Sequence, residues 1–170
     1  MANTWTALTT AVAFAAGKNM LAILNGGARV LRIRRIIFVN VQTVAVTGVL
    51  CTGEVRRYTG AGISGHTPVT PVAMDTGNSA LISVTVGTAG TPTGTATALL
   101  RYIWSSDEPA VGTGTWDEWE TLLGLVWDTG YGDSNLQALT LRQNEMLCIY
   151  NTAGAAGLVD VFVELTDEAS

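Results

Sequence analysis

The sequence carries little charge. Only 14% of its 170 residues are Asp, Glu, Lys or Arg, whereas a soluble globular domain usually carries about 25%. An isolated domain normally keeps a charged, mixed surface so that it stays dispersed. Two interpretations are open: partner molecules cover much of the surface, or the protein is a neutral, threonine-rich monomer. The composition favours the first.

Histidine and cysteine are also scarce, with one and two residues. His66, Cys51 and Cys148 are too few and too scattered to form a recognisable zinc motif. A Ser–His or Cys–His catalytic site would have to use His66, and the nearby Ser64 comes without a third group to orient the imidazole. We predict an ordinary loop histidine. Both cysteines lie in strand-like runs, so we predict reduced, buried thiols in a protein made in a cytoplasm.

Membrane-spanning, secretory and nucleic-acid-binding signals are lacking too. No run is long and apolar enough to predict a transmembrane helix, and no basic residue precedes the apolar stretch 5–16, as a signal peptide requires. The net charge of −5 argues against nucleic-acid binding, which needs a dominant basic face. Residues 1–70 hold seven basic residues and one carboxylate, whereas residues 71–170 hold two arginines and thirteen carboxylates. This division permits complementary contact between copies, or with an acidic protein lattice.

What the sequence does contain is period-two alternation of apolar and polar residues, the signature of half-buried strands. In the closing run, Val159, Val161, Val163 and Leu165 are predicted to face a core, with the intervening carboxylates facing outward. Residues 80–86 alternate in the same way. The other predicted strands complete a set of about ten short ones: 6–14, 19–24, 29–41, 44–58, 96–104, 122–128, 136–142 and 146–151.

Turn sequences separate these runs. Asn25-Gly26-Gly27 predicts a tight turn, residues 88–94 predict a loop joining two neighbouring strands, and residues 60–77 predict a longer surface excursion. Only residues 116–123 favour a short helix. Many short strands without long helices predict an all-β protein, a jelly-roll-like antiparallel sandwich with long Gly/Thr/Pro loops. We assign this single domain to residues 17–170, preceded by an N-terminal strand or arm over residues 1–16.

Two patterns that suggest chemistry do not withstand inspection. Residues 60–65 match GxGxxG, but nucleotide binding needs a helix to begin there, and the prolines at 68 and 71 forbid one. Carboxylates cluster near Asp128 and Asp133 without the spacing of a calcium loop. A carboxylate pair could hydrolyse a glycosidic bond, but we predict solvated loop carboxylates. The sequence therefore predicts no catalytic residue, no metal site and no cofactor.

Four tryptophans, Trp104, Trp116, Trp119 and Trp127, fall within one stretch. Aromatic side chains on the rim of a sandwich could stack on sugars. The alternative, which we favour, is that Trp104 and Trp127 fill the core while Trp116 and Trp119 anchor a loop or a protein interface, where tryptophan is enriched.

Five arginines interrupt or end predicted strands: Arg32, Arg34, Arg35, Arg56 and Arg57. Such side chains are costly on an apolar strand unless they are paired or lie at an edge. They could discourage wrong edge pairing, or they could bind carboxylates on another subunit. Both alternatives stay open.

The N-terminal segment 1–16 contains the apolar residues Leu8, Val12 and Phe14, separated by Thr and Ala. It could complete a sheet of its own domain, or it could add a strand to the exposed edge of a neighbouring molecule. The second alternative is slightly favoured here, because strand exchange is an inexpensive way to lock an oligomer.

Three segments carry a family resemblance: residues 54–60 (EVRRYTG), 67–76 (TPVTPVAMDT) and 139–152 (LTLRQNEMLCIYNT), the last followed by an alternating strand. Over about residues 45–166 the chain resembles small virion proteins of tailed bacteriophages, closest to head decoration, or cement, proteins. These motifs are strand-and-turn patterns without a catalytic residue.

The resemblance implies a jelly-roll-like sandwich that assembles as a homotrimer on the capsid exterior and clamps neighbouring major capsid subunits. It implies a virion protein made in the host cytoplasm, with no direct contact to nucleic acid or membrane. Tail and fibre proteins have similar sandwiches, so the alternative is a tail module that binds host-surface carbohydrate through its Trp-bearing loops.

Overall fold

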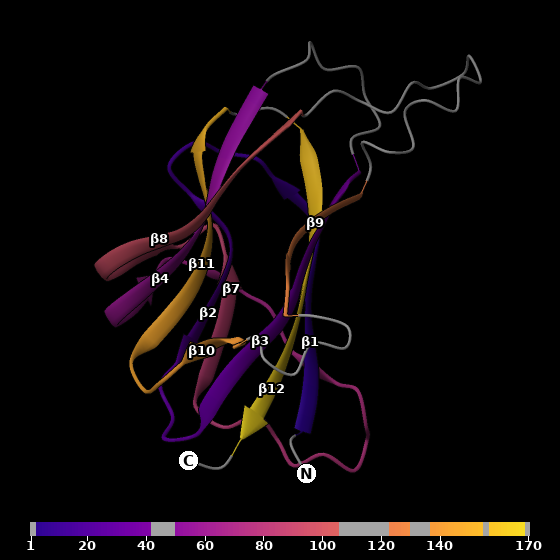
Figure 1. Ribbon diagram of the computed structural model, residues 1–170, viewed down its shortest axis with the longest axis vertical. Coiled ribbons are helices and arrows are strands. Elements are labelled where there is room, and N and C mark those ends of the chain that lie inside the picture. Colours follow the sequence, from indigo (N-terminus) through magenta and orange to yellow (C-terminus); the bar gives the residue numbers. More distant parts are fainter. Residues whose placement is uncertain (1–2, 42–49, 106–122, 130–136, 155–156, 169–170) are drawn as a thin grey trace, which may run out of the picture.

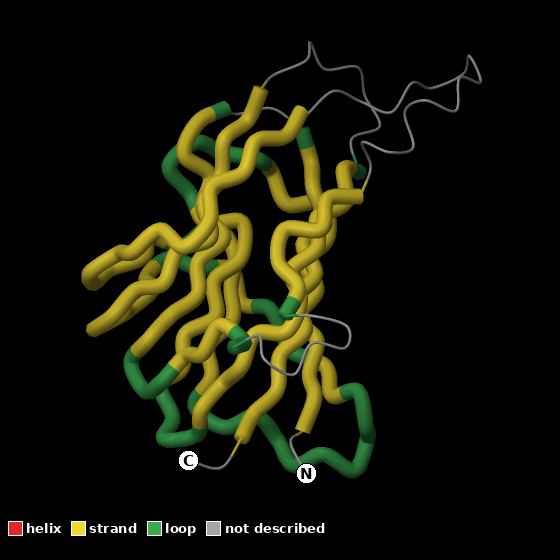
Figure 2. The backbone as a smooth tube through the Cα atoms, viewed as in Figure 1, coloured by secondary structure: helices red, strands yellow, loops and turns green. Residues whose placement is uncertain are grey.

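The computed structural model describes residues 3–41, 50–105, 123–129, 137–154 and 157–168. In these residues the protein is all-β, and two antiparallel sheets face each other as the layers of a sandwich (Figures 1 and 2). The predicted fold class is confirmed. The strands are β1 (Asn3–Ala13), β2 (Asn19–Asn25), β3 (Val30–Asn40), β4 (Leu50–Ser64), β5 (Thr67–Pro68), β6 (Val72–Ala73), β7 (Val84–Thr88), β8 (Thr91–Ser105), β9 (Leu123–Asp128), β10 (Leu139–Leu141), β11 (Glu145–Ala153) and β12 (Leu158–Glu168).

The strands pair as nested partners from the two halves of the chain. β1 pairs with β12, β2 with β11, β3 with both β9 and β10, and β4 with β8. One sheet, called sheet A here, has the order β10-β3-β12-β1-β6, with β9 also on β3; sheet B has the order β5-β7-β2-β11-β4-β8. The four-strand orders β1-β12-β3-β10 and β2-β11-β4-β8 are those of a jelly roll, in which two Greek keys form opposed sheets.

The core lies between the two sheets and follows the alternation in the sequence. Val159, Val161, Val163 and Leu165 of β12 are at most 1% exposed, as predicted. Leu21 and Ile23 of β2, Leu147 and Ile149 of β11 and Val55 of β4 meet them from sheet B. Because successive strand residues point to opposite faces, the alternating positions form the two outer faces of the sandwich.

The N-terminal segment is a strand of its own sheet. β1 lies between β12 and β6, in register from Asn3 opposite Asp167 to Ala13 opposite Leu158. Its side chains Trp5 and Ala7 are buried in the core, as is Phe14 just beyond it. The slightly favoured expectation of an arm exchanged with a neighbour is therefore wrong, because this segment supplies core residues to its own domain.

Residues 65–90 cross the side of the sandwich from one sheet to the other. β5 and β7 extend sheet B, whereas β6 extends sheet A beside β1. The strand predicted over residues 80–86 begins only at Val84, and Ile82 is 68% exposed. The loop predicted over residues 88–94 was expected to join two neighbouring strands. It lies instead between β7 and β8, which do not pair with each other. In residues 65–90 the alternation of apolar and polar residues indicated that strands form, but it did not show which strands pair with each other.

The long β4–β8 ladder is irregular between Thr59 and Gly62, where glycines allow the two backbones to approach closely. Gly94 of β8 has φ +109°, and a Cβ atom there would lie 2.6 Å from the carbonyl oxygen of Thr59. Beyond this irregularity, Ala61 and Ile63 of β4 pack against a second, smaller cluster that includes Met146 and Cys148 on the outer face of sheet B. Of the residues that match GxGxxG, 60–64 thus belong to β4 and Gly65 follows it directly, and no helix begins there.

Candidate protein interface

An apolar row crosses the outer face of sheet A. Leu8 of β1 lies opposite Phe162 of β12, which in turn lies opposite Ile37 of β3. Leu8 is 53% exposed, and the other two side chains are partly exposed. Val72 of β6, 63% exposed, lies opposite Thr6 in the next row, and Met74 just beyond β6 is 64% exposed. We call these five residues the apolar outer face.

Charged groups flank the row of Leu8, Phe162 and Ile37 on both sides. In the neighbouring row, Glu164 of β12 lies opposite Arg35 of β3, which lies opposite Asp128 of β9. The Arg35 Nε atom is 3.5 Å from Asp128 Oδ2. On the other side, the Asp160 carboxylate accepts a 2.7 Å hydrogen bond from the Ala11 N–H. Asp128 is exposed, as predicted, but the predicted loop position is wrong, because this residue ends β9 and pairs with Arg35.

Three of the five predicted interface arginines bind carboxylates of their own chain. Arg32 Nε lies 2.6 Å from Glu168, Arg56 Nε lies 2.7 Å from Glu54, and Arg35 contacts Asp128. Arg56 also stacks on the ring of Tyr150, with its Cζ atom 3.9 Å from the ring centroid. β3 has neighbours on both sides, so its arginines do not protect a sheet edge.

The other two arginines differ from these. Arg34 forms no ion pair within the described part of the chain, and its carbonyl accepts hydrogen bonds from the N–H and hydroxyl of Thr129. Arg57 lies opposite Leu147, a core residue, so its side chain starts on the inner face of sheet B. Its Nε is buried without a hydrogen-bond partner. Arg34 therefore remains an interface candidate and Arg57 does not.

The remaining sequence candidates divide in the same way. Leu8 is exposed, whereas Phe14 is 2% exposed and does not form an outer contact. Val12 is partly buried, packs against the core and also lines a cleft at the side of the sandwich. Trp116 and Trp119 lie outside the described residues, as does the predicted helix except for Leu123. Trp127 packs against the core as predicted.

Sequence reasoning missed Ile37, Val72, Met74 and Phe162. Phe162 carried a usable signal, because it is an aromatic residue at a position that the alternation assigns to the outer face. Val72 and Met74 lie in the predicted surface excursion of residues 60–77. This segment has no regular alternation of apolar and polar residues that could show which face of a sheet they occupy.

The histidine and the two cysteines lie in packing positions. His66 lies over Gly87, where an added Cβ would come within 2.4 Å of its Cδ2 atom. Cys51 and Cys148 are buried, as predicted, and neither forms a disulfide within the described residues. Burial raises the pKa of the Cys148 thiol to about 12, which keeps it protonated and unreactive at neutral pH. Within the described residues no group of three or more His, Cys, Asp or Glu side chains is placed to hold a metal ion.

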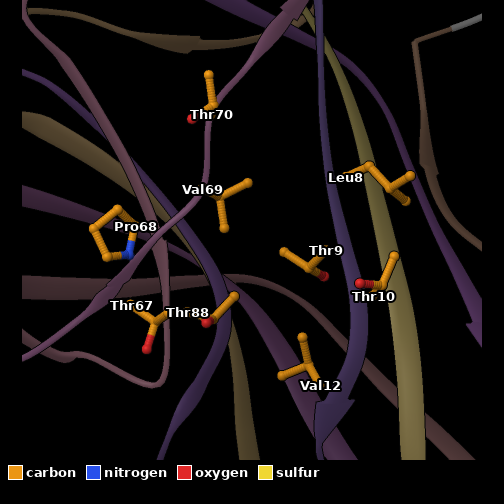
Figure 3. Close-up of a pocket in the computed structure, with 9 residues that line it drawn as sticks. All are labelled: Leu8, Thr9, Thr10, Val12, Thr67, Pro68, Val69, Thr70 and Thr88. Atoms are coloured by element: carbon orange, nitrogen blue, oxygen red, sulfur yellow. The ribbon is translucent and has the colours of Figure 1, made fainter.

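A cleft opens at the side of the sandwich, between β1 and the segment 67–70 (Figure 3). Its volume is about 310 Å³, and its lining consists of five threonines with Leu8, Val12, Pro68 and Val69. None of the lining residues is charged. In the described part of the chain, no helix is long and apolar enough to cross a membrane.

Comparisons with family models, with curated proteins and with solved structures find no significant match to this chain.

Proposed function

We propose that this chain is a non-enzymatic virion structural protein that decorates the outside of a bacteriophage head. It acts as a homotrimer and stabilises contacts between major capsid subunits. The observation that carries the proposal is the apolar outer face, on which Leu8, Phe162 and Ile37 lie in one row across three strands, with the exposed Val72 and Met74 in the next rows at the β6 edge. Contiguous exposed apolar side chains on a soluble protein mark interaction sites.

Other observations support a protein partner. The low charge content fits a surface that partners cover. Asp160 and Glu164 stand beside the apolar outer face on β12, so a complementary partner surface is apolar with a basic rim. The resemblance of residues 54–60, 67–76 and 139–152 to decoration proteins adds the location on a head.

The mechanism combines a rigid sheet with valency. A sheet fixed by packing on one face presents its other face without a large loss of conformational entropy on binding. Each subunit then needs only a modest contact, because a trimer joins three contacts at high effective concentration. Such a clamp requires no cofactor and no chemical step.

Binding to purified heads that lack this protein tests the proposal. We expect the double variant Leu8→Glu/Phe162→Glu to reduce occupancy at least about tenfold, because each buried apolar side chain contributes roughly 1.5–3 kcal/mol. The matched control is Ile103→Glu, which alters an equally exposed apolar residue, 61% exposed, on sheet B. Equal binding by the double variant and the control would contradict the proposal. Binding to host-surface glycans without binding to heads would favour the tail alternative.

Sedimentation of the free protein tests the assembly state. We expect a closed oligomer with the mass of three chains in dilute buffer. A clean monomer at micromolar concentration would contradict the homotrimer.

A further inference from the structure

The edge of β1 that faces away from β12 is only partly paired. β6 pairs with Trp5 and Thr6 only, and Met74 continues the contact by donating its N–H to the Thr4 carbonyl at 3.0 Å. Backbone groups of alternate residues in a strand point to the same edge. Leu8 therefore presents its N–H and C=O to the same edge as Thr4 and Thr6, but no strand of the described chain pairs with it there.

Pairing with sheet B draws residues 67–69 away from this edge. Continued pairing would place Thr70 opposite Leu8, since Val72 lies opposite Thr6. The chain instead joins sheet B, where β5 pairs with β7 and the Val69 N–H donates to the Val86 carbonyl at 2.9 Å. The excursion therefore crosses to the other sheet and leaves a wedge beside β1.

That wedge is the cleft of about 310 Å³. Figure 3 shows Thr9 and Val12 of β1 pointing into it, with Val69 pointing towards them from the opposite wall. Leu8 and Thr10 lie on the other side of β1 in this view. A β-bulge between Thr9 and Val12 bends the strand at this point, and bulges at sheet edges commonly end one pairing and shape the next contact.

We propose that the open edge of β1 from Leu8 to Val12 is a strand-acceptor site for an extended, uncharged segment of a partner polypeptide. The free backbone donor and acceptor of Leu8 select a polypeptide, because an added strand supplies matching groups at the same spacing. Alternate side chains of that strand enter the cleft between Val12 and Val69. The lining has no charge to pair with an ionic side chain, so small β-branched residues such as Thr and Val fit there.

The site goes beyond the proposed function and does not depend on a capsid partner. Five residues at about 3.4 Å each span the open edge. A suitable probe is therefore the capped peptide acetyl-Thr-Val-Thr-Val-Thr-amide, added at millimolar concentration to the full-length, ¹⁵N-labelled protein. We expect saturable amide shifts at residues 8–12 and 67–70. Hydrogen exchange of the Leu8 N–H should slow at least about tenfold when it gains a partner.

Two variants distinguish the contribution of the Leu8 backbone to peptide binding from that of its side chain. Leu8→Pro removes the N–H on the open edge, and proline is tolerated at such edge positions. We expect it to weaken peptide binding about tenfold, the effect of one lost hydrogen bond. Leu8→Ala keeps the N–H but shortens a side chain that lines the cleft, so it should weaken peptide binding less than Leu8→Pro does. It shortens a side chain of the apolar outer face, so it should weaken binding to heads, which distinguishes failure of this site from failure of the proposed function.

A peptide methylated on alternate backbone nitrogens gives a test that does not rely on folding of the proline variant. It should bind poorly, because it cannot complete the ladder. Equal binding by the methylated peptide, shifts centred elsewhere, or no saturable change would overturn the proposal. So would a saturable response to glucose in place of the peptide. If Leu8→Pro dissociates an oligomer while the peptide does not bind, a second copy occupies the edge and the assignment to a partner segment is wrong.

Discussion

At the scale of single residues, burial decides which reactive groups are available. Cys148 is fully buried, and the desolvation of its thiolate raises the pKa from 9.0 to about 12. Burial also raises the pKa of Tyr102 well above its usual value, and that of Tyr58 to a lesser extent. All three groups are held in their neutral forms, as residues that fill space.

Alkaline pH should therefore destabilise the protein. Below pH 9 the Cys148 thiol is protonated in both folded and unfolded chains, so its burial contributes fully to stability. Between pH 9 and about 12 the unfolded chain loses this proton while the folded chain keeps it. The free energy of unfolding should then fall by up to about 1.4 kcal/mol per pH unit for this group. Denaturant titrations at several pH values measure the slope, and Cys148→Ala should reduce it.

Thiol labelling provides an independent check at pH 8. The native protein should react slowly with a disulfide reagent, whereas the unfolded chain should expose both thiols. Rapid labelling of the native protein would show that the cluster around Cys148 opens readily.

At the scale of strands, the arginines of β3 stabilise pairs between neighbouring strands. Arg35 stands between Glu164 of β12 and Asp128 of β9 in one cross-strand row. Opposite charges at such positions stabilise a sheet by a few tenths of a kcal/mol to about 1 kcal/mol, and like charges destabilise it. The same row lies between the row of Leu8, Phe162 and Ile37 and the end of the sheet that contains Arg32 and Glu168.

Charge reversal at Arg35 should consequently lower stability, not merely assembly. Arg35→Glu places a third carboxylate in the row and should cost about 1 kcal/mol or more. Adding Asp128→Arg should recover part of the loss, and a double-mutant cycle measured by thermal unfolding gives the coupling. Arg34→Glu is the matched control, because its side chain has no ion pair in the described chain; its stability should change by less than about 0.5 kcal/mol. Equal effects at the two positions would contradict this assignment.

These strands also show how far the sequence could predict the structure. Alternation located β1, β3 and β12, because each buries one face and exposes more of the other. The runs of apolar residues between turns located β2 and β11, which are buried on both faces along most of their length. It could not reveal that β3 lies inside a sheet, since pairing of β3 with β9 and β12 depends on contacts between distant segments. For the same reason the arginines were assigned to an edge or to a neighbouring subunit. Phe162 was predictable as an outward residue, but its alignment with Leu8 and Ile37 required the register.

At the scale of the whole molecule, the jelly roll makes its first strand depend on its last. Asn3 lies opposite Asp167, and Figure 1 shows the two ends of the chain at the same end of the sandwich. The strand pairs are nested in the sequence: β2 and β11, which pair with each other, both lie between β1 and β12 along the chain. Removing an outermost strand therefore exposes core surface of its partner as well as of its own sheet.

Deleting residues 2–15 should abolish folding, since the deletion removes β1 with Trp5 and also Phe14, both of which are buried in the core. Loss of one large aromatic core residue alone costs about 3–5 kcal/mol, and a domain of this size is stable by only about 5–15 kcal/mol. Circular dichroism and tryptophan fluorescence of the truncated chain measure the outcome. A synthetic peptide of residues 2–15 should restore the native signal when added in excess, because it can pair with β12 from outside the chain. A folded truncated protein that binds heads poorly would instead show that this segment acts as an arm between molecules, contrary to the pairing of β1 within its own sheet.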